Sequence, residues 1–232
     1  VRSSAASDVY KRQLVNCCDS ARRVYDIVES TGKCKFLYML DLPHEDNECE
    51  KVKYAQAIMR LKKAYEKFSG KTFDKEAFLN SFTENETEMK PYIGLMGVRV
   101  TDILEKMIRD NIQMDVDNLT CTGGRQLAVV PEQMRQMDEE KMFLAYADAL
   151  LCQIPCFRMN NNTRRNQLYL DPNLKGIIYH TIKFCDYYGF EYASIKKNIK
   201  VPLLKIETDF TSQSAGQLLT RIQAFAETIE GS

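Results

Sequence analysis

The chain has 232 residues, which is enough for one large domain or for one and a half domains. Its 32 basic residues balance 32 acidic ones, and this balance argues against a nucleic acid or a membrane surface as a partner. No apolar run approaches the roughly 20 residues of a membrane span. Eight cysteines without secretory features favour a reducing, cytoplasmic compartment, and a metal or redox use over a disulfide framework.

The first α/β pattern follows a stretch that fits no element. Residues 1–13 begin with a Ser- and Ala-rich tract, and we expect them to be a non-native tail. The true amino-terminal part of the protein is then expected to lie outside this sequence. From Leu14 the pattern predicts a strand end, a turn with Asp19 or Ser20 as helix cap, a helix and a second strand. Residues 14–43 are therefore predicted to be the remnant of a first, incomplete α/β domain.

The next stretch, residues 44–90, is charged and has helical periodicity. One helix is expected to stop at Gly70, and a second is predicted from residue 74 to about residue 88. The apolar positions of the first helix recur at helical spacing, at Ile58, Leu61, Ala64, Tyr65 and Phe68. We interpret this region as a helical insert whose apolar stripe is either core or an inter-domain strut.

Strand and helix patterns alternate from residue 91 to residue 232. Strands are predicted at 92–97, 112–119, 175–182 and 201–206, and helices at 101–110, within 131–152, at 188–198 and at 214–228. Alternation without hairpin signals predicts a parallel, doubly wound sheet. We therefore expect residues 91–232 to form a second α/β domain, in which the strand at 175–182 is central.

Two cysteines have the same local setting. Cys185 follows the central strand, is followed by an Asp and precedes a helix, and Cys18 repeats this order in the first α/β unit. The carboxyl ends of parallel strands open into a crevice that faces the starts of the following helices, where the helix dipole favours a thiolate. The two thiolates could converge on one iron–sulfur cluster. Two buried structural cysteines are the alternative.

Four further residues are candidates at the strand ends. Cys121 precedes a Gly-Gly turn that ends at Arg125, whose guanidinium suits a phosphate or carboxylate; a plain loop is the alternative. His180 is either a general acid or base, or a structural histidine. Glu207 is a candidate base or an orienting group. We expect Cys121, Cys185 and Glu207 to share one edge of the sheet.

Several longer motifs occur in order between about residue 14 and residue 230. They are Cys-Asp-Ser at 18–20, Leu-Asp-Leu-Pro at 40–43, Leu-Thr-Cys-Thr-Gly-Gly-Arg at 119–125, Pro-Cys-Phe-Arg-Met at 155–159, Gly-Ile-Ile-Tyr-His-Thr-Ile-Lys-Phe-Cys-Asp at 176–186, and Ile-Glu-Thr-Asp-Phe through Gly-Gln-Leu-Leu-Thr-Arg-Ile at 206–222. Together they resemble the 2-hydroxyacyl-CoA dehydratase / benzoyl-CoA reductase family, and the run from 176 to 222 is the specific part of this resemblance.

The resemblance implies Rossmann-like parallel sheets and a helical insert. It also implies an iron–sulfur subunit of an oxygen-sensitive (R)-2-hydroxyacyl-CoA dehydratase, a hydro-lyase of amino-acid fermentation in anaerobes. The implied partners are a second dehydratase subunit, an ATP-hydrolysing activator that injects one electron, and the acyl-CoA substrate. The electron forms a ketyl radical anion, syn-type elimination of water gives a 2-enoyl-CoA, and the electron is recycled. Whether FMN accompanies the 4Fe-4S cluster stays open.

Carried over residue by residue, the resemblance makes Cys18 the second and Cys185 the third of three cysteine ligands, with the first upstream of this sequence. His180 and Glu207 are then candidate catalytic residues, and Cys121 and Arg125 candidate contacts of the CoA thioester or the cluster surroundings. A benzoyl-CoA-reductase-like subunit, a non-catalytic electron-relay or scaffold subunit, and an α/β binding module without metal are the alternatives. Product analysis, a CoA-thioester binding assay and anaerobic reconstitution distinguish them.

Overall fold

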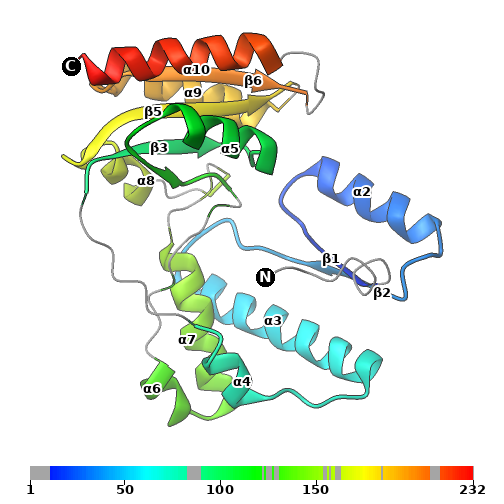
Figure 1. The fold of residues 1–232 in the computed structure, drawn as a ribbon. Helices are drawn as coiled ribbons and strands as arrows, with labels where there is room; N and C mark the ends of the chain where they lie inside the picture. Colours follow the sequence, from blue (N-terminus) through cyan, green and yellow to red (C-terminus); the bar gives the residue numbers. More distant parts are fainter. Residues whose placement is uncertain are drawn as a thin grey trace. The chain divides into compact units, whose positions relative to one another are not determined.

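The computed structural model describes residues 11–82, 90–121, 123, 127, 131–153, 156, 158–159, 163–183, 185–209 and 215–231 (Figure 1). The chain forms two compact units. Unit 1 consists of residues 1–84, 127–153 and 158–160, and unit 2 of residues 85–126, 154–157 and 161–232. No helix formed by the described residues is long and apolar enough to cross a membrane.

Unit 1 begins with a parallel strand–helix–strand unit. The strands β1 (Lys11–Val15) and β2 (Phe36–Leu40) pair in parallel, and α2 (Asp19–Ser30) connects them. The strand–turn–helix order predicted from Leu14 is confirmed. The strand starts earlier than expected, because residues 11–13, which were expected to belong to the tail, form the first three residues of β1.

Four helices complete the described part of unit 1. They are α3 (Glu48–Ser69), α4 (Lys75–Leu79), α6 (Pro131–Arg135) and α7 (Glu139–Cys152). The side chain of Asn47 caps α3 by accepting a hydrogen bond from the backbone N–H of Glu50 at 3.0 Å. Gly70 ends α3 in the left-handed conformation at φ 69°, so the predicted stop is confirmed. The expected stripe contributes Ile58 to a core shared by α3, α4, α6 and α7.

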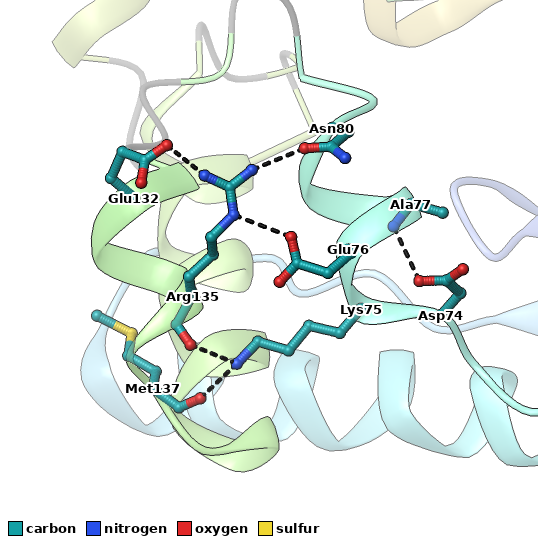
Figure 2. A network of polar contacts seen from close by, with 8 residues as sticks. All are labelled: Asp74, Lys75, Glu76, Ala77, Asn80, Glu132, Arg135 and Met137. Atoms are coloured by element: carbon teal, nitrogen blue, oxygen red, sulfur yellow. Dashed lines mark hydrogen bonds and ion pairs between the residues drawn. The ribbon is translucent and has the colours of Figure 1, made fainter.

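Residues 127–153 lie in unit 1, whereas the sequence analysis placed them in the second α/β domain. Polar contacts hold α6 against α4 (Figure 2). The guanidinium of Arg135 donates to Glu76 at 3.0 Å and to Asn80 at 2.7 Å, and it also contacts Glu132. The ammonium group of Lys75 donates to two backbone carbonyls, those of Arg135 at 2.8 Å and Met137 at 2.7 Å.

Unit 2 contains a four-stranded parallel sheet in the order β4-β3-β5-β6. The strands are β3 (Tyr92–Gly97), β4 (Asp115–Asn118), β5 (Leu174–Ile182) and β6 (Leu203–Thr208), and the helices are α5 (Asp102–Asn111), α8 (Thr163–Leu168), α9 (Asp186–Asn198) and α10 (Ala215–Glu230). Figure 1 shows these elements in green to red. The predicted α/β class and the parallel sheet are confirmed.

Helices cover both faces of this sheet. Alternate residues of β5 point to opposite faces, as the two-residue repeat of a strand requires. Ile178 packs with α5 and α10 in one buried cluster, whereas Ile177 and Tyr179 pack with α9 in the other. The sheet is therefore wound on both sides, and its carboxyl ends all lie at one edge.

Candidate functional site

The carboxyl edge of the unit 2 sheet contains a topological switch point. The chain leaves β3 for its neighbour β4 on one side, and then returns to place β5 on the other side of β3. In open α/β sheets ligands bind where neighbouring strands lead in opposite directions in this way. The loops after β3 and β5 are therefore the first place to look for a ligand site.

Cys185 lies at this point, as the N-cap of α9. Its backbone is extended, at φ −99° and ψ 97°, and its side chain is half-buried. The Cys185 N–H donates to the carbonyl of Ile182 at 3.1 Å, which turns the chain from β5 into the helix. The ammonium group of Lys183 pairs with Asp209 at 3.0 Å, so the loops after β5 and β6 are held together next to Cys185.

Cys18 occupies the same position in unit 1. It is half-buried and is the N-cap of α2, with an extended backbone at φ −162° and ψ 169°. The amide of Asn16 fixes the turn before it, because it donates to Asp41 at 2.9 Å and accepts from the guanidinium of Arg22 at 2.6 Å. The expected strand–turn–Cys-Asp–helix arrangement is therefore present in both units. Within the described residues, no group of three or more His, Cys, Asp or Glu side chains could hold a metal ion.

His180 is fully buried in β5, and both of its ring nitrogens have partners. Nδ1 lies 3.0 Å from the carbonyl of Val98, and Nε2 lies 2.8 Å from the hydroxyl of Thr208. Since a carbonyl can only accept, Nδ1 carries the proton and Nε2 accepts from Thr208. Burial lowers the pKa of His180, so the imidazole is neutral. This geometry favours the structural alternative, in which the ring joins β5 to β6 and to the end of β3.

Gly97 makes the close approach of these strand ends feasible. Its φ of 94° lies in the region that favours glycine, and a Cβ atom there would lie 2.1 Å from the carbonyl oxygen of His180. The same carbonyl accepts a hydrogen bond from the N–H of Val98 at 2.9 Å. Val98, the residue after β3, is thus held against the end of β5 at the switch point.

The other predicted residues lie at the same edge or outside the described part of the chain. The side chain of Cys121 is exposed after β4, and its N–H donates to the carbonyl of Gly97 at 3.2 Å. Glu207 lies within β6 rather than after it; its carboxylate is exposed and pairs with Lys205 at 3.3 Å. The parallel pairing confirms that Cys121, Cys185 and Glu207 share one edge of the sheet. Arg125 lies outside the described residues.

A contact that the sequence analysis missed involves Tyr188 of α9. Its hydroxyl lies 3.3 Å from the sulfur of Cys156. Burial, followed by the effect of the thiols of Cys156 and Cys121, raises the pKa of Tyr188. One signal was available in the sequence: Tyr188 is three residues after Cys185 and therefore lies on the same face of α9.

A buried polar network also fixes α9. The carboxylate of Glu191 binds the guanidinium of Arg165 from α8, with one contact at 2.7 Å. It also accepts from the hydroxyl of Tyr169 at 3.3 Å and from that of Tyr179 in β5. Burial, followed by the charge of Glu191, raises the pKa of both tyrosines. This network holds the helix that carries Cys185 and Tyr188 against the sheet.

Known proteins share sequence similarity with this chain. The sequence matches the family 2-hydroxyglutaryl-CoA dehydratase, D-component, over residues 14–90 and 80–229. It is 26% identical over 178 residues to an Escherichia coli (strain K12) protein that carries the name dehydratase subunit YjiM, covering 67% of this chain and 45% of that protein. It is 26% identical over 156 residues to the (R)-phenyllactyl-CoA dehydratase beta subunit of Clostridium sporogenes, covering 61% of this chain and 40% of that protein.

The aligned parts span less than half the length of these two curated relatives. The family match, in contrast, extends over nearly all of the chain, from residue 14 to residue 229, and includes both N-cap cysteines. The chain therefore belongs to the 2-hydroxyglutaryl-CoA dehydratase, D-component, family.

Proposed function

We propose that this chain is part of the iron–sulfur subunit of an (R)-2-hydroxyacyl-CoA dehydratase. Family membership supports the reaction class, and the relative named as an (R)-phenyllactyl-CoA dehydratase beta subunit supports the thioester substrate and a partner subunit. In this proposal the protein works with a second dehydratase subunit and an ATP-dependent activator, and it converts a 2-hydroxyacyl-CoA into a 2-enoyl-CoA.

The observation that carries the proposal is the pair of N-cap cysteines in the two units. Thiolates are the ligands that iron–sulfur clusters require, and the start of a helix favours the negative charge that a thiolate carries. Cys18 and Cys185 are both half-buried, so neither residue is fully buried in a core or fully exposed to water. The donor chemistry at both positions thus fits a 4Fe-4S cluster. In the proposal a third thiolate comes from outside these 232 residues.

A bound cluster would supply one electron to the thioester carbonyl of the substrate. The ketyl radical anion so formed would lose the 2-hydroxyl group as hydroxide and a proton from the neighbouring carbon, and the electron would then return to the cluster. Cys121 is exposed at the carboxyl edge of the sheet, and in this proposal Cys121 and Arg125 contact the CoA thioester. The carboxylate of Glu207 is exposed and is the candidate proton acceptor. The buried, doubly hydrogen-bonded ring of His180 positions the strand ends.

The test is the iron and acid-labile sulfide content of the full gene product after anaerobic purification. We expect about four iron atoms per protein chain. The Cys18→Ala and Cys185→Ala variants are each expected to lose most of this iron. Cys34→Ala is the matched control, because Cys34 is also half-buried but donates to the carbonyl of Phe36 at 3.2 Å. Unchanged iron in the two ligand variants would contradict the assignment.

A second assay tests the reaction itself. The reduced, activated complex is given an (R)-2-hydroxyacyl-CoA, and the products are separated by mass. A 2-enoyl-CoA formed without net consumption of electrons is the expected result. Reduction of an aromatic thioester with consumption of electrons would instead identify a benzoyl-CoA-reductase-like enzyme. Thioester binding confined to the partner subunit would identify an electron-relay or scaffold role for this chain.

A further inference from the structure

Arg158 and His44 meet in unit 1, although they are 114 residues apart in the sequence. His44 lies in the loop after β2, and Arg158 lies in the segment before α8. Nη1 of Arg158 lies 3.4 Å from Nδ1 and 3.5 Å from Nε2 of the His44 ring. A hydrogen bond in the plane of the ring would approach one nitrogen and leave the other much farther away. The near-equal distances therefore place the guanidinium over the face of the imidazole, where an arginine stacks on a flat ring.

This stacked contact leaves polar groups of both side chains available to a ligand. Arg158 is half-buried, yet within the described residues its Nε and Nη2 atoms have no acceptor and its charge has no carboxylate partner. Nδ1 of His44 lies 3.4 Å from the carbonyl of Arg158, and since a carbonyl only accepts, Nδ1 carries a proton. Nε2 of the exposed His44 ring has no other partner in the described part of the chain. One edge of a guanidinium and one imidazole nitrogen are therefore free side by side.

The pair lies at the carboxyl end of a parallel strand. His44 follows β2, which pairs in parallel with β1, and ligands of α/β sheets bind outside the carboxyl ends of the strands. A cavity of about 260 Å³ adjoins His44, because its lining includes Pro43, the residue before it. The opposite wall of this cavity belongs to α3 and includes Tyr54 and Arg60. The cavity has room for a small organic group next to the two stacked side chains.

The charges that line the cavity are partly compensated within the chain. The ammonium group of Lys53 pairs with Glu50 at 2.7 Å, and the carboxylate of Asp41 accepts a hydrogen bond from the amide of Asn16 at 2.9 Å. The Arg60 guanidinium and the Tyr54 hydroxyl, in contrast, have no hydrogen-bond partner among the described residues. Burial, followed by the effect of Tyr146, raises the pKa of Tyr54 to about 12, so this hydroxyl keeps its proton. The uncompensated groups of the cavity are therefore donors, which favours an anionic ligand.

We propose that Arg158 and His44 bind the phosphate group of a phosphate monoester, and that the organic part of this ester enters the adjoining cavity. The Nε and Nη2 atoms of Arg158 donate two parallel hydrogen bonds to phosphate oxygens, the geometry for which a guanidinium is suited. The His44 ring donates to another phosphate oxygen in its protonated form. The proposal rests on the proposed function only for one source of the ester, the ribose phosphate of CoA. A free nucleotide is the other source.

The experiment uses the proton NMR signals of the imidazole rings. The chain has only two histidines, so the His44 signal reports on the site, and that of the buried His180 shows whether the fold is intact. CoA, dephospho-CoA, 3′-AMP and inorganic phosphate are added separately at constant pH and ionic strength. We expect CoA to shift the His44 signal in a saturable way, and dephospho-CoA, which lacks the monoester, to leave it in place. An equal affinity for 3′-AMP would identify a free nucleotide as the source, and a weaker one would identify CoA.

Arg158→Gln removes the charge and the two-pronged edge, and we expect at least about a tenfold loss of affinity, the effect of losing hydrogen bonds to a charged group. Arg158→Lys keeps the charge without the planar edge and is expected to bind with intermediate affinity. Arg23→Gln is the matched control, because the Arg23 side chain is 65% exposed and pairs with Asp26; this variant should bind as the wild type does. An unchanged His180 signal in each variant shows that a loss of binding is not a loss of fold.

Three results would overturn the proposal. They are a His44 signal that no phosphate monoester shifts, equal shifts with CoA and dephospho-CoA, and wild-type affinity in Arg158→Gln. Inorganic phosphate that binds as tightly as the esters would also contradict it, because the cavity would then hold no organic group. Neither iron content nor turnover enters this readout, so its failure is separate from failure of the dehydratase assignment.

Discussion

Arg165 and Glu191 form an ion pair inside unit 2 in which each side chain is only 3% exposed. The hydroxyl groups of Tyr169 and Tyr179 converge on the same carboxylate. A buried ion pair contributes modestly as a whole, because desolvation offsets much of the attraction. Its members nevertheless depend strongly on one another, since a single buried charge left without its partner is costly. The pair therefore fixes the position of α9 more than it adds to stability.

We predict that Glu191→Leu alone destabilises unit 2 by about 3–5 kcal/mol, because it leaves the guanidinium of Arg165 buried without its carboxylate. The double variant Arg165→Met with Glu191→Leu is expected to recover most of this loss. Urea unfolding monitored by tyrosine fluorescence measures both. Equal losses in the single and the double variant would show that the two side chains are not coupled.

His180 gives a prediction about pH. Burial lowers the pKa of His180 in the folded chain. In an unfolded chain a histidine side chain has a pKa of about 6.5. Below that pH the unfolded state binds a proton that the folded state does not, so this histidine reduces the free energy of unfolding as the pH falls, by at most about 1.4 kcal/mol per pH unit. His180→Gln is expected to remove this slope between pH 7 and pH 5.

The control for this experiment is the second histidine of the chain, His44, which is exposed. His44→Gln should leave the slope of the wild-type chain in place. Thr208→Val removes the hydroxyl that faces Nε2 and should lower stability at all pH values while the slope remains. A slope that persists in His180→Gln would mean that other groups cause it.

The two strand–turn–helix units around Cys18 and Cys185 were predictable, because each depends on residues close in sequence. A β-branched run predicts β5, and the polar turn after it predicts that a helix follows, although α9 begins at Asp186 rather than at the expected residue 188. The parallel sheet followed from the alternation of elements. The shared carboxyl edge then followed from the parallel direction, so the placement of Cys121 could be derived without coordinates.

Contacts between distant segments could not be predicted in this way. The predicted helix from residue 74 ends at Leu79, because the next backbone bonds join residues three apart, from Ser81 to Phe78 and from Phe82 to Leu79. This turn brings Phe82 against Tyr146 of α7, with ring centroids 5.8 Å apart. The membership of α7 in unit 1 and the contact of Cys156 with Tyr188 likewise depend on tertiary packing that no local pattern records.

A substitution of Lys75 would test which contacts hold α4 against α6 in unit 1 (Figure 2). Its ammonium group donates to the carbonyls of Arg135 and Met137 at 2.8 and 2.7 Å. Lys75→Met keeps the aliphatic stem and removes both bonds, and we expect a loss of about 1–3 kcal/mol. Lys141→Met is the control, because Lys141 is 74% exposed and its ion pair with Asp138 should contribute little. Equal unfolding midpoints for both variants would contradict the prediction.

Gly97 provides the sharpest test of the switch-point geometry, because two glycine substitutions in unit 2 should act with opposite sign. Gly97→Ala places a Cβ atom 2.1 Å from the carbonyl oxygen of His180 at a φ of 94°, so the strand ends must separate; we expect a loss of at least about 2 kcal/mol. Gly189→Ala lies within α9 and meets nothing within 4 Å, so helix propensity should add up to about 1 kcal/mol. The midpoints of thermal unfolding of the two variants and of the wild type measure both effects. If Gly97→Ala proved as stable as the wild type, β3 and β5 would not approach each other as closely as described, and the crevice assigned to Cys185 would lose its structural basis.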